Sequence, residues 1–275
     1  MDEQQQQEEK QQEAIERRSP PGEVVYHAIY VEGEHELKRN SLELAFSGLA
    51  AGLSMGFSMV GEALLKANLP DARWATLLSK FGYSLGFLIV FLGRQQLFTK
   101  NTLTVILPLL REKRVEVLWN VARLWTVVLL ANLIGGFIFA WISARSNLFN
   151  PEIRATFATI GRTSLEPDFW TLVIRGAIAG WLIALIAWLL PFAESGRVWV
   201  IIILAYTVGL ADLPHIIAGS IEVFYLVCAG QAEFWSIVGH YIVPTLIGNV
   251  VGGVALVAFG AHAEFFEAEQ AITNG

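Results

Sequence analysis

The chain has 275 residues, of which 54% are hydrophobic and only 16% are charged. Because a soluble domain carries about 25% charged residues, this composition fits one membrane domain better than two soluble domains. The net charge of −6 comes from acidic residues near both ends and in the loops. No basic stripe with interleaved aromatic residues points to nucleic acid. The single cysteine, Cys228, lies in an apolar run and cannot form a disulfide within the chain.

The first 40 residues differ in composition from the rest. Residues 1–22 are rich in Gln, Glu, Lys and Arg and end in Pro-Pro-Gly, which predicts a partly disordered tail. Residues 34–39 predict a polar helix at the membrane face. The start lacks the basic-then-apolar pattern of a signal peptide. We therefore expect a cytoplasmic tail over 1–40, a transmembrane domain over 41–262 and a cytoplasmic tail over 263–275.

Six apolar stretches follow the tail, each near the ~20 residues that a membrane-spanning helix needs. They cover residues 42–65, 81–110, 124–142, 172–190, 198–229 and 237–261. An even number of crossings places both termini on one side of the membrane. The basic cluster within 111–123 favours the cytoplasmic side for both.

The second and fifth stretches are each interrupted halfway. The first break reads GRQQLFT over residues 93–99, and the second reads ADLPH over residues 211–215. Polar or irregular backbone at bilayer depth is tolerated where it is buried in protein or lines a water-filled cavity. Paired breaks in corresponding segments point to a solute site at the midplane. The pattern predicts a transporter or channel.

The two halves also repeat the same motifs in the same order, with small-residue pairs in the first and fourth stretches and Asn-x-x-Gly-Gly in the third and sixth. The residues are Gly48 and Gly52, Gly176 and Gly180, Asn132, and Asn249. Each pattern alone is common where helices pack closely. Three spans per half is an odd number, so the halves must insert in opposite orientations. The expected fold is an all-α membrane protein with an inverted 3+3 repeat and broken second and fifth helices.

His215 is the sharpest candidate for chemistry, since it follows Pro214 inside the second break. A lone histidine on an apolar face is ordinarily a buried, neutral packing residue. Inside a helix break we favour a position facing the pore, where an imidazole can gain or lose a proton near neutral pH.

Three cations, Arg94, Lys100 and Arg175, have no acidic residue within the first broken helix or the fourth span to neutralise them. Unpaired positive charge of this kind favours the entry of anions. The alternative, most serious for Arg175, is that a long side chain near a helix end reaches the interface.

Other residues near the breaks have two open interpretations. Thr99 and Asn101 could cap the half-helix that begins at the first break, or Thr99 could offer its hydroxyl to a solute. Asp212 could pair with a base or orient His215, while Glu222 has no evident role. Four apolar side chains would form constrictions unless they only pack the core: Phe87, Leu97, Phe98 and Val208.

These residues resemble the formate/nitrite transporter family over about residues 42–261. The motifs are Leu97-Phe98-Thr99, the segment from Arg175 to Trp188, His215 with Ala218, and the segment from Pro244 to Gly253. Within the family, the run from Arg94 to Thr99 is most similar to an inner-membrane branch of bacterial proteins.

The resemblance implies an aquaporin-like subunit of six helices, assembled as a homopentamer in which each subunit has its own pore. It implies passage of small monovalent anions such as formate or nitrite, often with a proton, and neither a cofactor, a metal nor an enzymatic activity. Carried over by position, His215 would be the central proton-exchanging histidine and Thr99 its hydrogen-bond partner. Asn249 would be a polar pore residue, and Arg175 would replace a vestibule lysine.

The chain departs from the family pattern at several polar pore positions, which leaves the anion open. The departures are Arg94, Gln96, Gly180, Pro214 and Gly219. One alternative is a channel for small neutral solutes, which predicts flux that does not depend on pH. Another is a membrane enzyme using His215 with Asp212, but the predicted core holds no second histidine to complete a catalytic set. A structural or sensory role would leave the intramembrane charges unexplained.

Overall fold

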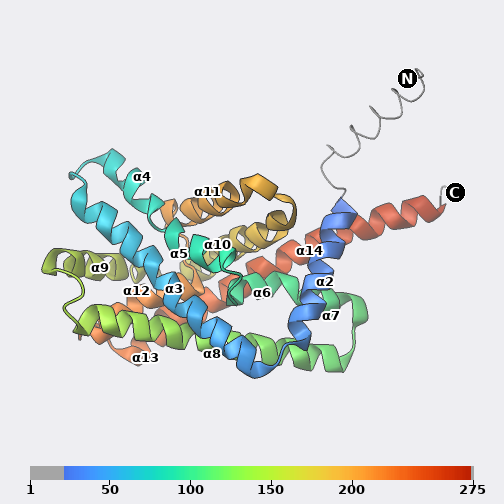
Figure 1. The fold of residues 1–275 in the computed structure, drawn as a ribbon, viewed down its shortest axis with the longest axis horizontal. Coiled ribbons are helices and arrows are strands. Elements are labelled where there is room, and N and C mark those ends of the chain that lie inside the picture. Colours follow the sequence, from blue (N-terminus) through green and yellow to red (C-terminus); the bar gives the residue numbers. More distant parts are fainter. Residues whose placement is uncertain (1–21, 274–275) are drawn as a thin grey trace, which may run out of the picture.

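The computed structural model describes residues 22–273, with side chains through residue 258. The tail predicted for residues 1–21 lies outside this range. Between residues 22 and 273 the chain forms helices joined by turns and contains no strand (Figure 1). The predicted all-helical class is confirmed for this part of the chain.

The polar helix expected before the first span is present and longer than predicted. It is α2 (Gly22–Lys38), which packs against α6, α7 and α8 of the same chain. The first span, α3 (Ser41–Asn68), follows directly. Asn40 caps it, since its Oδ1 accepts the backbone N–H of Glu43 at 2.9 Å.

The second span begins earlier than predicted. It consists of α4 (Arg73–Phe81) and α5 (Ser84–Leu92), joined by a turn at Gly82. A Cβ at Gly82 would lie 2.2 Å from the carbonyl carbon of Gly61, so the turn approaches α3 at backbone distance. After the first break come α6 (Phe98–Thr104) and α7 (Ile106–Glu112).

The third span, α8 (Val115–Arg145), is followed by a helix that lies between the third and fourth predicted apolar stretches and was not predicted. This is α9 (Pro151–Ser164), capped by Asn150, whose side chain accepts the backbone N–H of Ile153. Its apolar residues occupy one face only, with Phe157 fully buried, so this helix does not form a continuous apolar stretch in the sequence. The Asn-Pro start was the available signal.

The fourth span, α10 (Phe169–Leu189), begins after Asp168. The Asp168 carboxylate accepts the Thr171 hydroxyl and the backbone N–H groups of Thr171 and Trp170, and these hydrogen bonds lower the pKa of this carboxyl. Two short turns, η1 (Leu190–Phe192) and η2 (Glu194–Gly196), lead to the next helix.

The second half ends with helices that frame the second break. They are α11 (Arg197–Leu210), α12 (Ile216–Cys228), α13 (Phe234–Ile237), the π-helix η3 (Val238–Ile242) and α14 (Val243–Thr273). Five segments of the described chain are long and apolar enough to cross a membrane. The fifth predicted stretch is instead divided into α11 and α12, each too short to cross alone.

Two helix pairs hold the core together: α3 with α8, and α10 with α14 (Figure 1). At each contact a glycine meets backbone. A Cβ on Gly52 would lie 2.2 Å from the carbonyl oxygen of Asn132, and a Cβ on Gly180 would lie 2.3 Å from that of Asn249. The small-residue motifs therefore allow backbone-to-backbone approach, as in other membrane helix pairs.

Candidate functional site

Both predicted breaks are present, and their local geometry matches. The non-helical residues are 93–97 and 211–215. Each break contains one residue with a left-handed backbone, Arg94 at φ 50° and Asp212 at φ 48°. Two segments far apart in the sequence therefore leave and re-enter helix by the same turn.

An asparagine from α8 anchors the first break. Asn132 Oδ1 accepts the backbone N–H of Phe98 at 2.9 Å, and its Nδ2 donates to the carbonyl oxygens of Gln96 and Gly48 at 2.8 and 2.7 Å. This amide satisfies backbone groups that the break leaves unpaired. Asn132, rather than Thr99 or Asn101, therefore caps α6.

Asn249 from α14 performs the same function in the second break. Its Oδ1 accepts the backbone N–H of Ile216 at 2.8 Å, and its Nδ2 donates to the carbonyl oxygens of Pro214 and Gly176 at 3.0 and 2.9 Å. Asn249 is fully buried and lines neither of the two cavities described below. The hydrogen bonds of Asn249 are thus those of a backbone anchor, which the repeated Asn-x-x-Gly-Gly motif could have suggested, and its role as a polar pore residue stays a prediction.

His215 joins the two breaks. Its Nδ1 accepts the backbone N–H of Ala218 at 3.2 Å, so a neutral ring carries its proton on Nε2. Nε2 lies 2.8 Å from Thr99 Oγ1, in the first turn of α6. The Thr99 hydroxyl then accepts from the imidazole and keeps its own hydrogen to donate. The His215 ring is fully buried and packs edge-on against the ring of Phe87, with 5.0 Å between the ring centroids.

A cavity of about 260 Å³ reaches this histidine, and we call it the His215 cavity. Its wall includes Val208, Arg175 and Glu222. A second cavity of about 570 Å³, the Arg94 cavity, is lined by α2, the end of α5, the first break and the end of α10.

The two cavities lie at opposite ends of the same helices. On α10, the His215 cavity touches Arg175 and the Arg94 cavity touches Ala187. At 1.5 Å per residue these positions are about 18 Å apart along the helix. Phe87 on α5 and Leu97 in the first break, both fully buried, belong to the region between them.

The four predicted constriction residues therefore have different surroundings. Val208 lines the His215 cavity, and Phe87 packs on the His215 ring. Leu97 is buried at the end of the first break. Phe98 packs edge-on against Trp125 of α8, with 5.7 Å between the ring centroids, and it lines neither cavity. These contacts are those of an ordinary core residue.

One of the three predicted free cations is paired. Lys100 Nζ lies 2.5 Å from Glu32 Oε1, a partner 68 residues earlier on α2. The expectation that Lys100 is unneutralised is wrong, because its acidic partner lies on α2, outside the broken helix that carries Lys100. Arg94 and Arg175 are exposed and line the Arg94 cavity and the His215 cavity, respectively.

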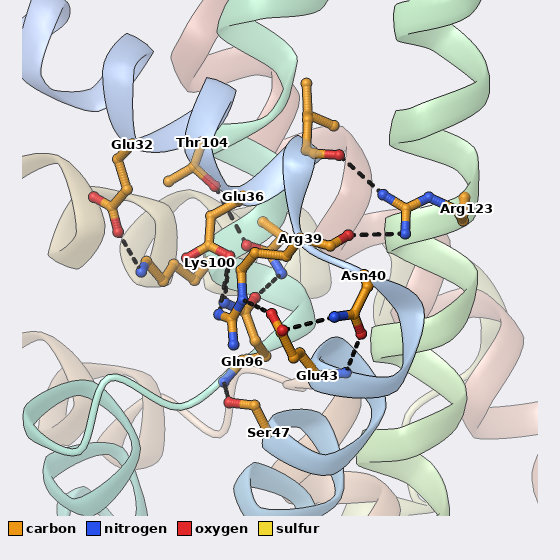
Figure 2. Close-up of polar contacts among 12 residues, drawn as sticks. Glu32, Glu36, Arg39, Asn40, Glu43, Ser47, Gln96, Lys100, Thr104 and Arg123 are labelled. Atoms are coloured by element: carbon orange, nitrogen blue, oxygen red, sulfur yellow. Dashed lines mark hydrogen bonds and ion pairs between the residues drawn. The ribbon is translucent and has the colours of Figure 1, made fainter.

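Figure 2 shows how α2 is attached to the first break. The Glu36 carboxylate, 7% exposed, accepts from Gln96 Nε2 at 2.7 Å and from Arg39 at 3.1 Å. Arg123 on α8 donates to the carbonyl oxygens at the end of α2. The N-terminal helix is thus part of the wall of the Arg94 cavity.

Asp212 pairs with a base and does not contact His215 through any hydrogen bond described. Lys80 Nζ lies 2.8 Å from Asp212 Oδ1 and 2.9 Å from Glu62 Oε1. The His215 cavity as a whole has mixed charge, with four acidic and three basic side chains: Glu62, Glu166, Asp212, Glu222, Lys66, Lys80 and Arg175. The Arg94 cavity holds more cations than carboxylates, so of the two cavities only this one carries the excess of positive charge that favours the entry of anions.

Metal ligation has no support in the described residues, where no group of three His, Cys, Asp or Glu side chains could hold an ion. The buried imidazole already uses both ring nitrogens in hydrogen bonds to protein.

Comparison with known proteins places this geometry in context. The family profile of the formate/nitrite transporters matches residues 23–263. The chain is 37% identical over 240 residues to the inner membrane protein YfdC of Escherichia coli, covering 87% of this chain and 77% of YfdC. It is 26% identical over 231 residues to the formate channel BtFdhC of Bacillus thuringiensis, covering 81% and 85% of the two chains.

A solved structure described as a pentameric formate channel with formate bound shares the fold. Its TM-score is 0.71 at 20% identity, and the match covers 82% of this chain and 98% of that chain. The profile match spans nearly all of the described helices, including both breaks and both asparagine anchors. On this evidence the chain belongs to the formate/nitrite transporter family.

Proposed function

We propose that this protein is a multi-pass inner-membrane channel or transporter that lets a small monovalent anion of the formate or nitrite type cross. The supporting observation is the pair of cavities at opposite ends of α5 and α10, with the His215–Thr99 hydrogen bond between them. The formate channel BtFdhC and the inner membrane protein YfdC support the substrate class and the location. We propose no enzymatic activity, cofactor or metal.

The architecture proposed for this function is an inverted 3+3 repeat of six crossing segments. The matching hydrogen bonds of Asn132 and Asn249 support a two-fold relation between the halves. We propose five subunits per assembly, as in the related pentameric formate channel. Residues 41–262 would form the membrane domain, and the flanking segments 1–40 and 263–275 would both face the cytoplasm.

In the proposed path, cations attract the anion and apolar side chains strip it of water. Arg175 and Arg94 would attract it at the two mouths, and Lys100 would contribute less because Glu32 neutralises it. Phe87, Leu97 and Val208 would form the dry region, where a bare charge is costly. Protonation of the anion beside His215 would remove that charge. The Thr99 hydroxyl, with its hydrogen free, would donate to the passing solute.

Flux in proteoliposomes tests this proposal. The full-length chain is reconstituted, and uptake of formate, nitrite, acetate, lactate and hydrosulfide is measured at a mildly acidic and a neutral pH. We expect at least one of these anions to pass, with faster flux at the lower pH. His215→Phe should lower the flux near neutral pH beyond the loss seen in the control below. Thr99→Val should lower flux by roughly fivefold to tenfold, the equivalent of about one hydrogen bond, whereas Thr99→Ser should not.

His240→Phe is the matched control, because His240 is exposed and lines neither cavity. Passage of water or small neutral solutes alone, at a rate unaffected by pH, would instead establish the neutral-solute channel.

A further inference from the structure

The His215 cavity contains a buried carboxyl that the proposed path does not use. Glu222 is 6% exposed and lines the same cavity as His215. His215, Gly219 and Glu222 are spaced i, i+4, i+7, so they share one face of α12, and all three line the cavity. Glu222 lies about 10 Å from His215 along the helix axis.

Between His215 and Glu222, the hydroxyl group of Tyr241 lies against α12 at Gly219. A Cβ on Gly219 would lie 1.7 Å from the Tyr241 hydroxyl oxygen, so the absence of a side chain at Gly219 lets that hydroxyl rest on the helix. Tyr241 comes from η3, and π-helices frequently occur at functional sites. Each turn of this α12 face therefore presents a polar group to the cavity.

The two buried carboxyls of this cavity have different partners: Glu222 is hydrogen-bonded to a neutral hydroxyl, whereas Glu62 is paired with the cation Lys80. Glu222 Oε2 accepts the Ser164 hydroxyl from α9 at 2.5 Å. Lys80, the cation in this part of the cavity, is within 2.9 Å of both Glu62 and Asp212. No ion pair in the described part of the chain joins Glu222 to a base. A buried carboxyl without a counter-ion is costly as an anion and can hold a proton instead.

The charged and titratable groups facing Glu222 across the cavity come from every element around it. They are Glu62 of α3, Lys80 of α4, Tyr83 before α5, Asp212 of the second break, Arg175 of α10 and Tyr241 of η3. Lys66 and Glu166 also line the cavity, and both are exposed. Since Lys80 is engaged by two carboxylates, Arg175 and Lys66 are the cations of this cavity wall for which no ion pair is described, and they can attract an incoming anion.

We propose that Glu222 is a second proton-exchange site of this vestibule, which protonates a weak-acid anion before it reaches His215. The proton moves from the Glu222 carboxyl to an oxygen of the anion, giving the neutral acid and the Glu222 carboxylate. Vestibule water then returns a proton to Glu222. One proton crosses with each anion, and the substrate class narrows to anions of weak acids. The inference rests on the proposed permeation function.

Formate uptake into proteoliposomes, measured over a pH series, tests this assignment. Glu222→Gln should lower flux about tenfold near neutral pH and approach the wild-type rate at strongly acidic pH, where formic acid is already protonated in the bulk. Damage to folding alone would lower flux at every pH. Glu152→Gln, an exposed carboxyl on α9 outside both cavities, is the control.

Ser164 supplies a second variant. Ser164→Ala removes the donor that stabilises the Glu222 carboxylate, so the pH profile should move upward by about one unit, while Ser164→Thr should restore it. Infrared difference spectra of the same proteins report the proton directly. A protonated-carboxyl band should be present in the wild type, absent in Glu222→Gln and shifted in Ser164→Ala.

The outcomes separate the two proposals. A wild-type protein that passes no weak-acid anion overturns the proposed function, while the infrared band still decides the protonation of Glu222. A wild-type protein that passes formate, with an unchanged pH profile in Glu222→Gln, overturns the role of Glu222 alone. Absence of a protonated-carboxyl band from the wild-type spectrum at every pH overturns it as well, and this readout does not depend on the folding of a variant.

Discussion

The amide of Asn249 performs in the second half of the chain the function that Asn132 performs in the first. Each side chain accepts one backbone N–H at a helix break, donates to one carbonyl oxygen of that break, and donates to a second carbonyl oxygen on a neighbouring helix. The breaks can exist in a low-dielectric interior because these groups are paired. An asparagine suits both roles since it carries an acceptor and two donors on a short side chain.

Replacing this anchor should therefore destabilise the protein. Asn249→Ala removes the side-chain partner of the Ile216 N–H and of the Pro214 carbonyl oxygen at the second break, together with a third hydrogen bond to Gly176 of α10, and we expect a loss of at least about 2 kcal/mol of stability. Thermal unfolding in detergent measures the effect. Asn68→Ala is the matched control, because the Asn68 amide makes one exposed hydrogen bond at the end of α3. Equal stability of the two variants would contradict the anchoring role.

At the scale of elements, α2 is attached to the first half of the membrane domain by close packing as well as by charge. The Glu32–Lys100 pair is partly exposed and contributes modestly. The closer constraint is Gly33, where a Cβ would lie 2.1 Å from the carbonyl oxygen of Thr104. Backbone cannot yield as a flexible side chain can, so this contact determines how near α2 lies to α6.

Gly33→Ala should lift α2 away from α6, at a cost of roughly 1 to 3 kcal/mol from overpacking. Hydrogen exchange of the α2 amides checks this, with faster exchange expected in the variant than in the wild type. Gly196→Ala is the control, because a Cβ there meets nothing within 4 Å. If both variants exchange alike in α2, then α2 does not depend on the Gly33 contact.

At the scale of the whole molecule, the outer helices present large apolar side chains to their surroundings. Trp119, Trp170 and Trp235 are between 69% and 75% exposed. In a membrane, such side chains face lipid or a neighbouring subunit. Exposed apolar side chains occur on helices of both halves, so in the proposed assembly they would face lipid or the neighbouring subunits.

The proposed assembly is checked by native mass spectrometry of the detergent-solubilised protein, which should give the mass of five chains. Reporter fusions at the two ends of the chain should place both in the cytoplasm, as the basic cluster within 111–123 predicts. Monomers throughout a range of mild detergents, or termini on opposite sides, would contradict this arrangement.

The amino-acid sequence was enough to predict the membrane class, both helix breaks and the repeated motifs, since these depend on composition and on the local chemistry of Pro, Gly and Asn. It also identified His215 and Thr99, which the structure joins by a hydrogen bond. Their detailed roles as pore residues stay predictions. The helix α9 was missed because its apolar face is narrow.

The neutralisation of charges depends on how the helices pack and could not be predicted from local sequence. Lys100 meets an acid 68 residues away, and Lys80 meets Asp212 132 residues away. Only packing revealed that Asn249 faces backbone and lines neither cavity, and that Glu222 shares a cavity wall with His215. The local sequence pattern indicates which secondary structure a segment can form, whereas the pairing of side chains that are distant in the sequence depends on how the helices pack.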